Sequence, residues 1–126
     1  MPIPYKPFKI TSPLSKEKTQ KYYAKVITHG EIDLRNLAEK ITSMSTLSTV
    51  DIVAVLESLL KVIPEELLSG YIVKLGDLGS FAPSVKSEGS KTEKEFTSKM
   101  IKETTILFKP GKYIKKRLKQ AKYEKI

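Results

Sequence analysis

The sequence predicts a small α+β protein in which two helices come first, a β-sheet follows, and a basic helix closes the chain. Apolar side chains recur at helical spacing between residues 34 and 67, and they alternate in short runs after residue 71. Helical spacing returns at residue 112. A length of 126 residues fits one domain with one core. We expect residues 1–30 to form an N-terminal extension, 31–122 the main domain and 123–126 a basic tail.

The extension holds four prolines in its first 20 residues, namely Pro2, Pro4, Pro7 and Pro13. Proline fixes the backbone and removes a hydrogen-bond donor, so we expect an extended or mobile arm over residues 1–20. The next run, Lys21–Ile27, is aromatic and β-branched, and it predicts one strand that stops at His29-Gly30.

Two helices are predicted in the middle of the chain. The first carries an apolar stripe made of Leu34, Leu37, Ala38 and Ile41, and Asp33 precedes it as a candidate N-cap.

The second predicted helix begins at a capping sequence, Ser48–Asp51, and ends at Ser69-Gly70. Pro64 lies inside it and should kink or divide it. Its apolar residues occupy more than one face, which is typical of a helix buried between two subunits.

From Tyr71 onward the sequence takes the period of strands. Tyr71–Leu75 and Ser80–Val85 predict a hairpin closed by Gly76–Gly79, and Thr104–Phe108 predicts a further strand. Lys112–Lys122 predicts a final helix, whose apolar side consists of Ile114, Leu118 and Ala121.

The segment between the hairpin and the later strand is polar. Lys86–Lys94 predicts a loop, and Glu93–Lys102 predicts a short helix with Phe96, Met100 and Ile101 turned inward.

The charge distribution indicates a polyanionic partner. The chain carries 23 basic and 14 acidic side chains, a net charge of +9. Residues 1–30 have a net charge of +5, residues 31–70 of −4, and residues 71–126 of +8. Basic ends around an acidic middle predict one face built for phosphate groups. A solvated lysine surface is the alternative interpretation of the same residues.

The residues needed for catalysis are missing from the sequence. It has no cysteine, and its single histidine, His29, stands beside a glycine at a predicted strand end. The adjacent Glu65 and Glu66 point to different helix faces and make a poor acid–base pair. No run approaches the roughly 20 apolar residues of a membrane span, and the N-terminus lacks a signal peptide's apolar stretch. We expect a cytoplasmic protein that is not an enzyme and takes no cofactor, metal or small-molecule substrate.

The most basic segment is C-terminal. Eight basic residues and one acid, Glu124, lie between Lys109 and Lys125. Pro110-Gly111 precedes the predicted helix, so free N–H groups and the positive dipole end would lie beside the lysines, as in a phosphate site. Lysine neutralises phosphate as a point charge and reads base edges poorly, so we expect weak sequence preference.

Two stretches resemble the HU/IHF family of bacterial histone-like proteins. Leu75–Phe81, LGDLGSF, is similar to the family hairpin, with its last three residues matching outright. Phe108–Leu118, FKPGKYIKKRL, is similar to the IHF form of the last helix. The resemblance covers about residues 31–122, and the long extension looks like the HU-related proteins of Bacteroidetes. Between Val85 and Thr104 the family's arginine-rich stretch and asparagine-proline arm tip are missing.

The resemblance implies an intertwined homodimer whose sheets form a saddle under double-stranded DNA. The implied function is architectural, nucleoid-associated DNA binding with weak sequence specificity, through lysine–phosphate contacts. The predicted DNA-binding residues come from the hairpin and the last helix, and the arm lysines are added from charge alone. They are Lys74, Gly79, Ser80, Lys86, Lys91, Lys94, Lys99, Lys102, Lys109, Gly111, Lys112, Lys115, Lys116 and Lys119. The predicted dimer interface consists of Val53, Leu56, Leu59, Leu60, Ile63 and two core aromatics, Phe81 and Phe108.

Two other functions fit parts of the sequence. The same lysines would serve an RNA or ribosome-associated protein, and the strand with Tyr22 and Tyr23 suits base stacking. An HU-like interaction module without DNA binding is the other alternative, because Asp77 and the altered arm depart from the family pattern.

Overall fold

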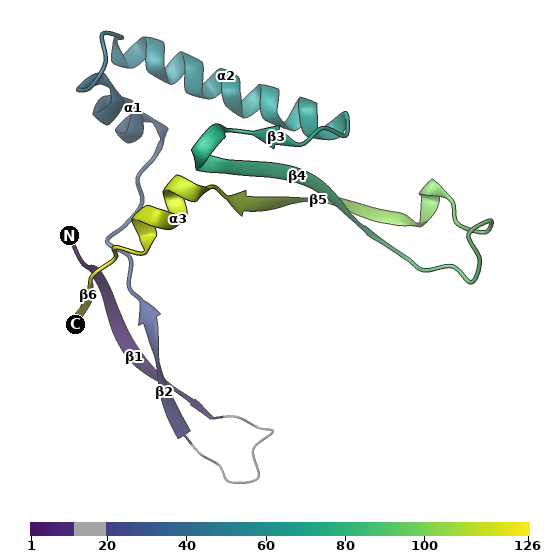
Figure 1. Cartoon of the computed structure of the whole chain (residues 1–126), viewed down its shortest axis with the longest axis horizontal. Coiled ribbons are helices and arrows are strands. Elements are labelled where there is room, and N and C mark those ends of the chain that lie inside the picture. The colour runs from purple at the N-terminus through teal and green to yellow at the C-terminus, as the bar shows by residue number, and fades with distance from the viewer. Residues whose placement is uncertain (12–19) are drawn as a thin grey trace. The chain divides into compact units, whose positions relative to one another are not determined.

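The computed structural model describes residues 1–11 and 20–126 (Figure 1). It contains two compact units: Leu34–Lys116 form the larger one, and Met1–Asp33 together with Arg117–Ile126 form the smaller one. Each unit has its own three-stranded sheet. Pro13 of the predicted arm lies outside the described residues.

Both predicted helices of the larger unit are confirmed. α1 spans Leu34–Thr42 and α2 spans Thr49–Leu68. Ser48 caps α2, because its side-chain oxygen accepts a hydrogen bond from the Asp51 N–H at 3.2 Å.

The C-terminal end of α2 is a Schellman motif. Gly70 takes a φ of 88°, its N–H donates to the Leu67 carbonyl at 3.0 Å, and the Tyr71 N–H donates to the Glu66 carbonyl at 3.1 Å. These bonds tie Tyr71 to the helix end. Strand β3 therefore covers only Val73–Lys74 and is shorter than predicted.

α1 and α2 pack against each other and supply the two buried apolar side chains of the larger unit, Ala38 and Ile52. A hydrogen bond of 3.0 Å between the hydroxyls of Thr42 and Thr49 joins the end of one helix to the start of the next. α2 continues through Pro64 as a single helix, so the predicted division there is wrong. A proline removes one backbone bond, and the rest of this 20-residue helix outweighs that loss.

The sheet of the larger unit has the order β3-β4-β5 and is antiparallel throughout. β4 spans Gly79–Ser87 and β5 spans Ile101–Pro110, so both predicted strands exist and are longer than predicted. The predicted turn before β4 contains a short 3₁₀ helix, Gly76–Leu78. β4 and β5 continue together as an arm (Figure 1).

The predicted helix over Glu93–Lys102 is wrong. The segment holds separate turns, a 3₁₀ helix at Ser98–Met100, and the start of β5 at Ile101. An isolated helix this short gains little from propagation after its costly nucleation. Phe96 stays 39% exposed, so the expected inward packing of this residue does not occur within one chain.

α3 spans only Lys112–Leu118, and the predicted extension to Lys122 is wrong. Turns follow instead, with hydrogen bonds from Gln120 and Ala121 back to carbonyls three residues earlier. Ile114 is half-buried, but Leu118 is exposed and does not join a core within the chain.

The smaller unit has a sheet of order β2-β1-β6 (Figure 1). β1 spans Ile3–Thr11, β2 spans Gln20–Val26 and β6 spans Tyr123–Lys125. β2 confirms the predicted strand. β1 and β6 occupy regions predicted as an arm and a basic tail.

Two prolines concealed β1 from sequence reasoning. Pro4 still accepts a hydrogen bond from the Ile27 N–H at 2.9 Å through its carbonyl, so it costs the ladder one bond. Pro7 lies opposite Ala24, three positions from Pro4. Antiparallel pairs alternate between hydrogen-bonded and non-hydrogen-bonded, and the Pro7–Ala24 pair is a non-hydrogen-bonded one, so β2 needs no N–H donor from Pro7. β6 pairs only with Ile3 to Tyr5, so it needs no donor from Pro7 either.

Phe81 and Phe108 are not core residues within one chain. Their rings contact each other with centroids 5.0 Å apart, yet Phe108 is 49% exposed and Phe81 is half-buried. Much of α2 is similarly open: Val53, Leu56 and Ile63 are half-buried, while Leu59 and Leu60 are exposed. One chain alone therefore leaves the predicted interface residues largely uncovered.

Candidate nucleic-acid interface

The sheet register gathers three predicted DNA-binding residues into one row. Lys74 of β3 lies opposite Ser80 of β4, and Ser80 lies opposite Lys109 of β5. Residues directly opposite each other project from the same face of a sheet. The row therefore presents two ammonium groups with a hydroxyl between them.

The next row carries the opposite chemistry. Val73, Phe81 and Phe108 are paired across the same three strands, one position along each strand from the basic row. Because neighbouring side chains in a strand point to opposite faces, the aromatic row lies on the other side of the sheet. The sheet thus has a basic side and an apolar side at this end.

A shallow pocket of about 200 Å³ opens at the basic row. It is lined by Lys74, Gly76, Gly79, Ser80, Lys109, Pro110 and Gly111. Five of these seven belong to the predicted DNA-binding set, although they come from separate parts of the sequence. In chemical terms the pocket offers two cations and a hydroxyl donor, which suits an anionic oxygen group such as a phosphate.

Two glycines permit the close backbone approach that forms the pocket. Gly79 takes a φ of 146°, and a Cβ there would lie 2.5 Å from the Lys109 carbonyl oxygen. A Cβ on Gly111 would overlap the carbonyl group of Asp77. The Gly111 N–H donates to the Leu78 carbonyl at 3.0 Å, so it is engaged and is not the free phosphate donor that we expected.

α3 adds charge beside this end of the sheet. Lys112, Lys115 and Lys116 are exposed in the larger unit. The helix has only seven residues, so the dipole argument is weaker than predicted and the lysine charges dominate. Lys119 lies beyond the helix, in a turn of the smaller unit, and is not grouped with these three.

The arm is less basic than the lysine count suggested. Lys86 pairs with Glu103 at 3.8 Å, and Lys102 pairs with Glu88 at 3.6 Å. Residues 86–103 hold five lysines and four glutamates, a net charge of +1. Lys91, Lys94 and Lys99 are exposed near the tip. The arm therefore contributes little net field, and the basic row with α3 is the stronger candidate.

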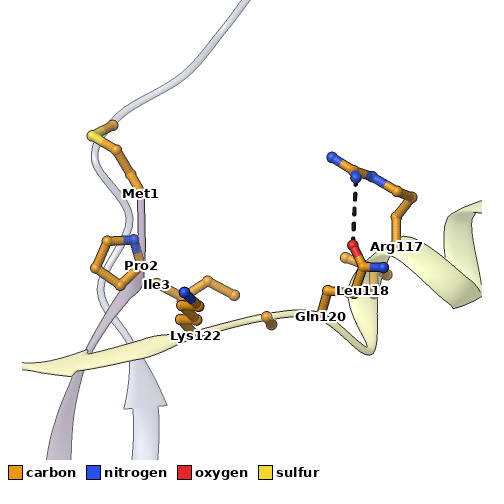
Figure 2. Close-up of a pocket in the computed structure, with 8 residues that line it drawn as sticks. Met1, Pro2, Ile3, Arg117, Leu118, Gln120 and Lys122 are labelled. Carbon is orange, nitrogen blue, oxygen red and sulfur yellow. Dashed lines mark hydrogen bonds between the residues drawn. The ribbon is translucent and has the colours of Figure 1, made fainter.

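A larger hollow, of about 590 Å³, belongs to the smaller unit (Figure 2). Met1, Pro2 and Ile3 line one part of it, and the segment from Arg117 to Lys122 lines another. The Arg117 guanidinium is directed at the Gln120 side chain, to which it donates at 3.4 Å. The polar side chains of the lining, Arg117, Gln120 and Lys122, are all exposed, so the hollow presents no built site.

Other kinds of site are not found among the described residues. They contain no group of three or more histidine, cysteine, aspartate or glutamate side chains placed to hold a metal. No helix in this part of the chain is long and apolar enough to cross a membrane.

A family model described as an HU domain fused to a wHTH, Ig or glycine-rich motif, HU-HIG, matches residues 1–125. The chain belongs to the HU-HIG family. Membership confirms the HU-like character expected from the hairpin and last-helix stretches. No curated protein matches the sequence significantly.

Twelve solved chains are significantly similar to this HU-HIG protein. One is the crystal structure of a protein from Bacteroides vulgatus ATCC 8482, to which DNA binding is provisionally assigned. It matches this chain with a TM-score of 0.69 and 11% sequence identity. The match covers 98% of this chain and 48% of that one, so the chain spans about half the length of its structural relative. At this identity the likeness establishes a shared fold.

Sequence reasoning missed one basic element of this HU-HIG chain. The residues of β1 and β2 include four lysines and no acid, at Lys6, Lys9, Lys21 and Lys25. Lys21 and Lys25 are four positions apart and so fall on one face of the predicted strand, but Lys6 and Lys9 lie in the segment whose prolines removed β1 from the prediction.

Proposed function

We propose that this protein binds double-stranded DNA as an architectural, nucleoid-associated protein with weak sequence preference. The observation that carries the proposal is the Lys74–Ser80–Lys109 row with its pocket, beside the exposed lysines of α3. Membership of the HU-HIG family and the net charge of +9 support it. A phosphate oxygen of a duplex backbone is the group that the pocket suits best.

Weak sequence preference follows from the side chains at this surface. The row and the exposed part of α3 in the larger unit consist of lysines, one serine and one tyrosine, Tyr113, with no arginine or asparagine among them. Lysine binds phosphate as a point charge, whereas discrimination between bases comes mainly from bidentate side chains. Affinity should therefore depend on salt far more than on sequence.

The DNA-binding form is proposed to be a homodimer. One chain leaves apolar side chains exposed along α2 and on the sheet of the larger unit: Val50, Val55, Leu59, Leu60, Val62, Leu68, Ile106 and Phe108. A second copy that covers them would supply the core that one chain lacks.

The test is duplex binding by the Lys74→Gln/Lys109→Gln variant, compared with Lys40→Gln/Lys61→Gln. Both variants remove two positive charges, and only the first removes them from the basic row. Each phosphate contact contributes about −0.9 to the slope of log K against log salt. With one phosphate at the pocket of each protomer of the dimer, the first variant's slope should be shallower by about 1.8. Between 50 and 200 mM salt it should lose about 12-fold less affinity than the wild type.

The control variant should keep a slope close to that of the wild type. Equal slopes for both variants would mean that the row makes no phosphate contact, and the proposal would fail. Fluorescence anisotropy with several unrelated 20-base-pair duplexes measures sequence preference in the same experiment.

A further inference from the structure

The hairpin of β1 and β2 has one face on which like charges stand opposite each other. Lys6 lies directly opposite Lys25, and the one acid in the described strands of this sheet, Glu124 of β6, lies on the same face opposite Pro4 and forms no ion pair with either lysine. Like charges at directly opposite positions destabilise a sheet. No other described residue forms an ion pair with either lysine. A bound anion would relieve this repulsion.

Aromatic side chains lie beside the lysine pair on the same face. Phe8 is opposite Tyr23, two positions along each strand from Lys6 and Lys25. Side chains two positions apart project from the same side of a strand. Phe8 is 38% exposed and Tyr23 is 50% exposed, so both rings are accessible.

We propose that this face, composed of Lys6, Lys25, Phe8 and Tyr23, binds single-stranded nucleic acid. The lysine pair would contact the phosphate backbone, and the aromatic pair would stack on adjacent bases. Single strands expose the faces of their bases and a duplex does not, so the aromatic pair separates this surface from the duplex-binding row. Stacking tolerates any base, so the surface should show little sequence preference.

Charge complementarity favours nucleic acid over a protein or a second copy of the chain. Lys21 lies further along the same face, opposite Ile10, so three lysines lie around the rings. A second copy would place the same lysines against each other. A protein partner would need acidic groups at matching intervals, whereas a nucleic-acid strand carries one phosphate at every base.

The opposite face of the hairpin provides a matched control. Lys9 is opposite Tyr22 and projects to the other side, and Tyr22 is 67% exposed. The test variant is Lys25→Gln/Tyr23→Val and the control is Lys9→Gln/Tyr22→Val. Each removes one lysine and one tyrosine from the same hairpin and keeps residues that suit a strand.

The probe is a fluorescein-labelled oligothymidylate of 12 nucleotides, bound to the full chain and followed by anisotropy. The test variant should bind it at least about tenfold more weakly, since one stacked base is worth roughly 5- to 160-fold and the loss of Lys25 adds to it. The control should stay within about twofold of the wild type. Binding of a 20-base-pair duplex should change little in either variant.

A single substitution separates binding from folding. Lys6→Gln removes the repulsion opposite Lys25, so the thermal midpoint should hold or rise while oligothymidylate binding weakens. Its salt slope for the single strand should be shallower by about 0.7. A merely structural lysine would not produce this combination.

Three outcomes would overturn the proposal. They are failure of the wild type to bind oligothymidylate, equal losses in test and control variants, and equal losses for single strand and duplex. The Lys74→Gln/Lys109→Gln variant tests the duplex proposal separately. It should lose affinity for duplex DNA and keep its affinity for oligothymidylate.

Discussion

Replacing Gly79 with alanine perturbs the backbone at the centre of the basic pocket. The native φ of 146° with ψ of −170° lies in a region that is essentially restricted to glycine, where another residue costs about 1–3 kcal/mol. The added Cβ would also lie 2.5 Å from the Lys109 carbonyl oxygen and 2.8 Å from the Phe108 ring. Overpacking of this kind costs about 1–3 kcal/mol more.

The expected loss of stability is therefore about 2–6 kcal/mol. For a unit the size of Leu34–Lys116 each kcal/mol lowers the midpoint by about 4–8 °C, so the midpoint should fall by at least about 8 °C. Thermal unfolding followed by circular dichroism, at one fixed protein concentration, measures it. Duplex binding at low temperature should weaken as well, because Lys109 is displaced from the row.

Gly89→Ala is the matched control in the arm. A Cβ on Gly89 has no neighbour within 4 Å and its φ is unexceptional, so the midpoint should change by no more than about 2 °C. Equal midpoints for Gly79→Ala and Gly89→Ala would refute the close approach of β4 and β5 on which the pocket depends.

Three further predictions concern assembly and DNA. Sedimentation at micromolar concentration should give a dimer, and Leu60→Glu on α2, where Leu60 is 56% exposed, should dissociate it; a stable folded wild-type monomer contradicts this. Replacing Lys112, Lys115 and Lys116 together with glutamine should reduce the salt slope for every duplex by up to about 2.7 for each protomer that contacts the DNA, and unchanged affinity would mean that these lysines form only a solvated surface. Energy transfer between duplex ends should report a shallow bend, because the arm tip has no proline wedge; a sharp bend that Phe96→Ala abolishes without unfolding contradicts this.

Local sequence signals predicted the elements whose causes are local. The capping sequence at Ser48 and the glycine stop at Gly70 place the ends of α2, because each satisfies backbone groups through neighbours in sequence. Alternation and glycine placed β4, and the two family-like stretches indicated the HU-like fold. Two wrong predictions also came from local signals. The prolines of β1 argued against a strand that exists, and the helical spacing over Glu93–Lys102 predicted a helix that does not form.

The sequence by itself determined the composition of the candidate surfaces: abundant lysine, little arginine, and a second helix with apolar residues on more than one face. Only the tertiary structure decided which of these residues lie together. Lys74, Ser80 and Lys109 form a row because strand pairing joins residues far apart in sequence, and register depends on the whole sheet. The same pairing places Lys6 against Lys25, a repulsion that no local pattern reveals.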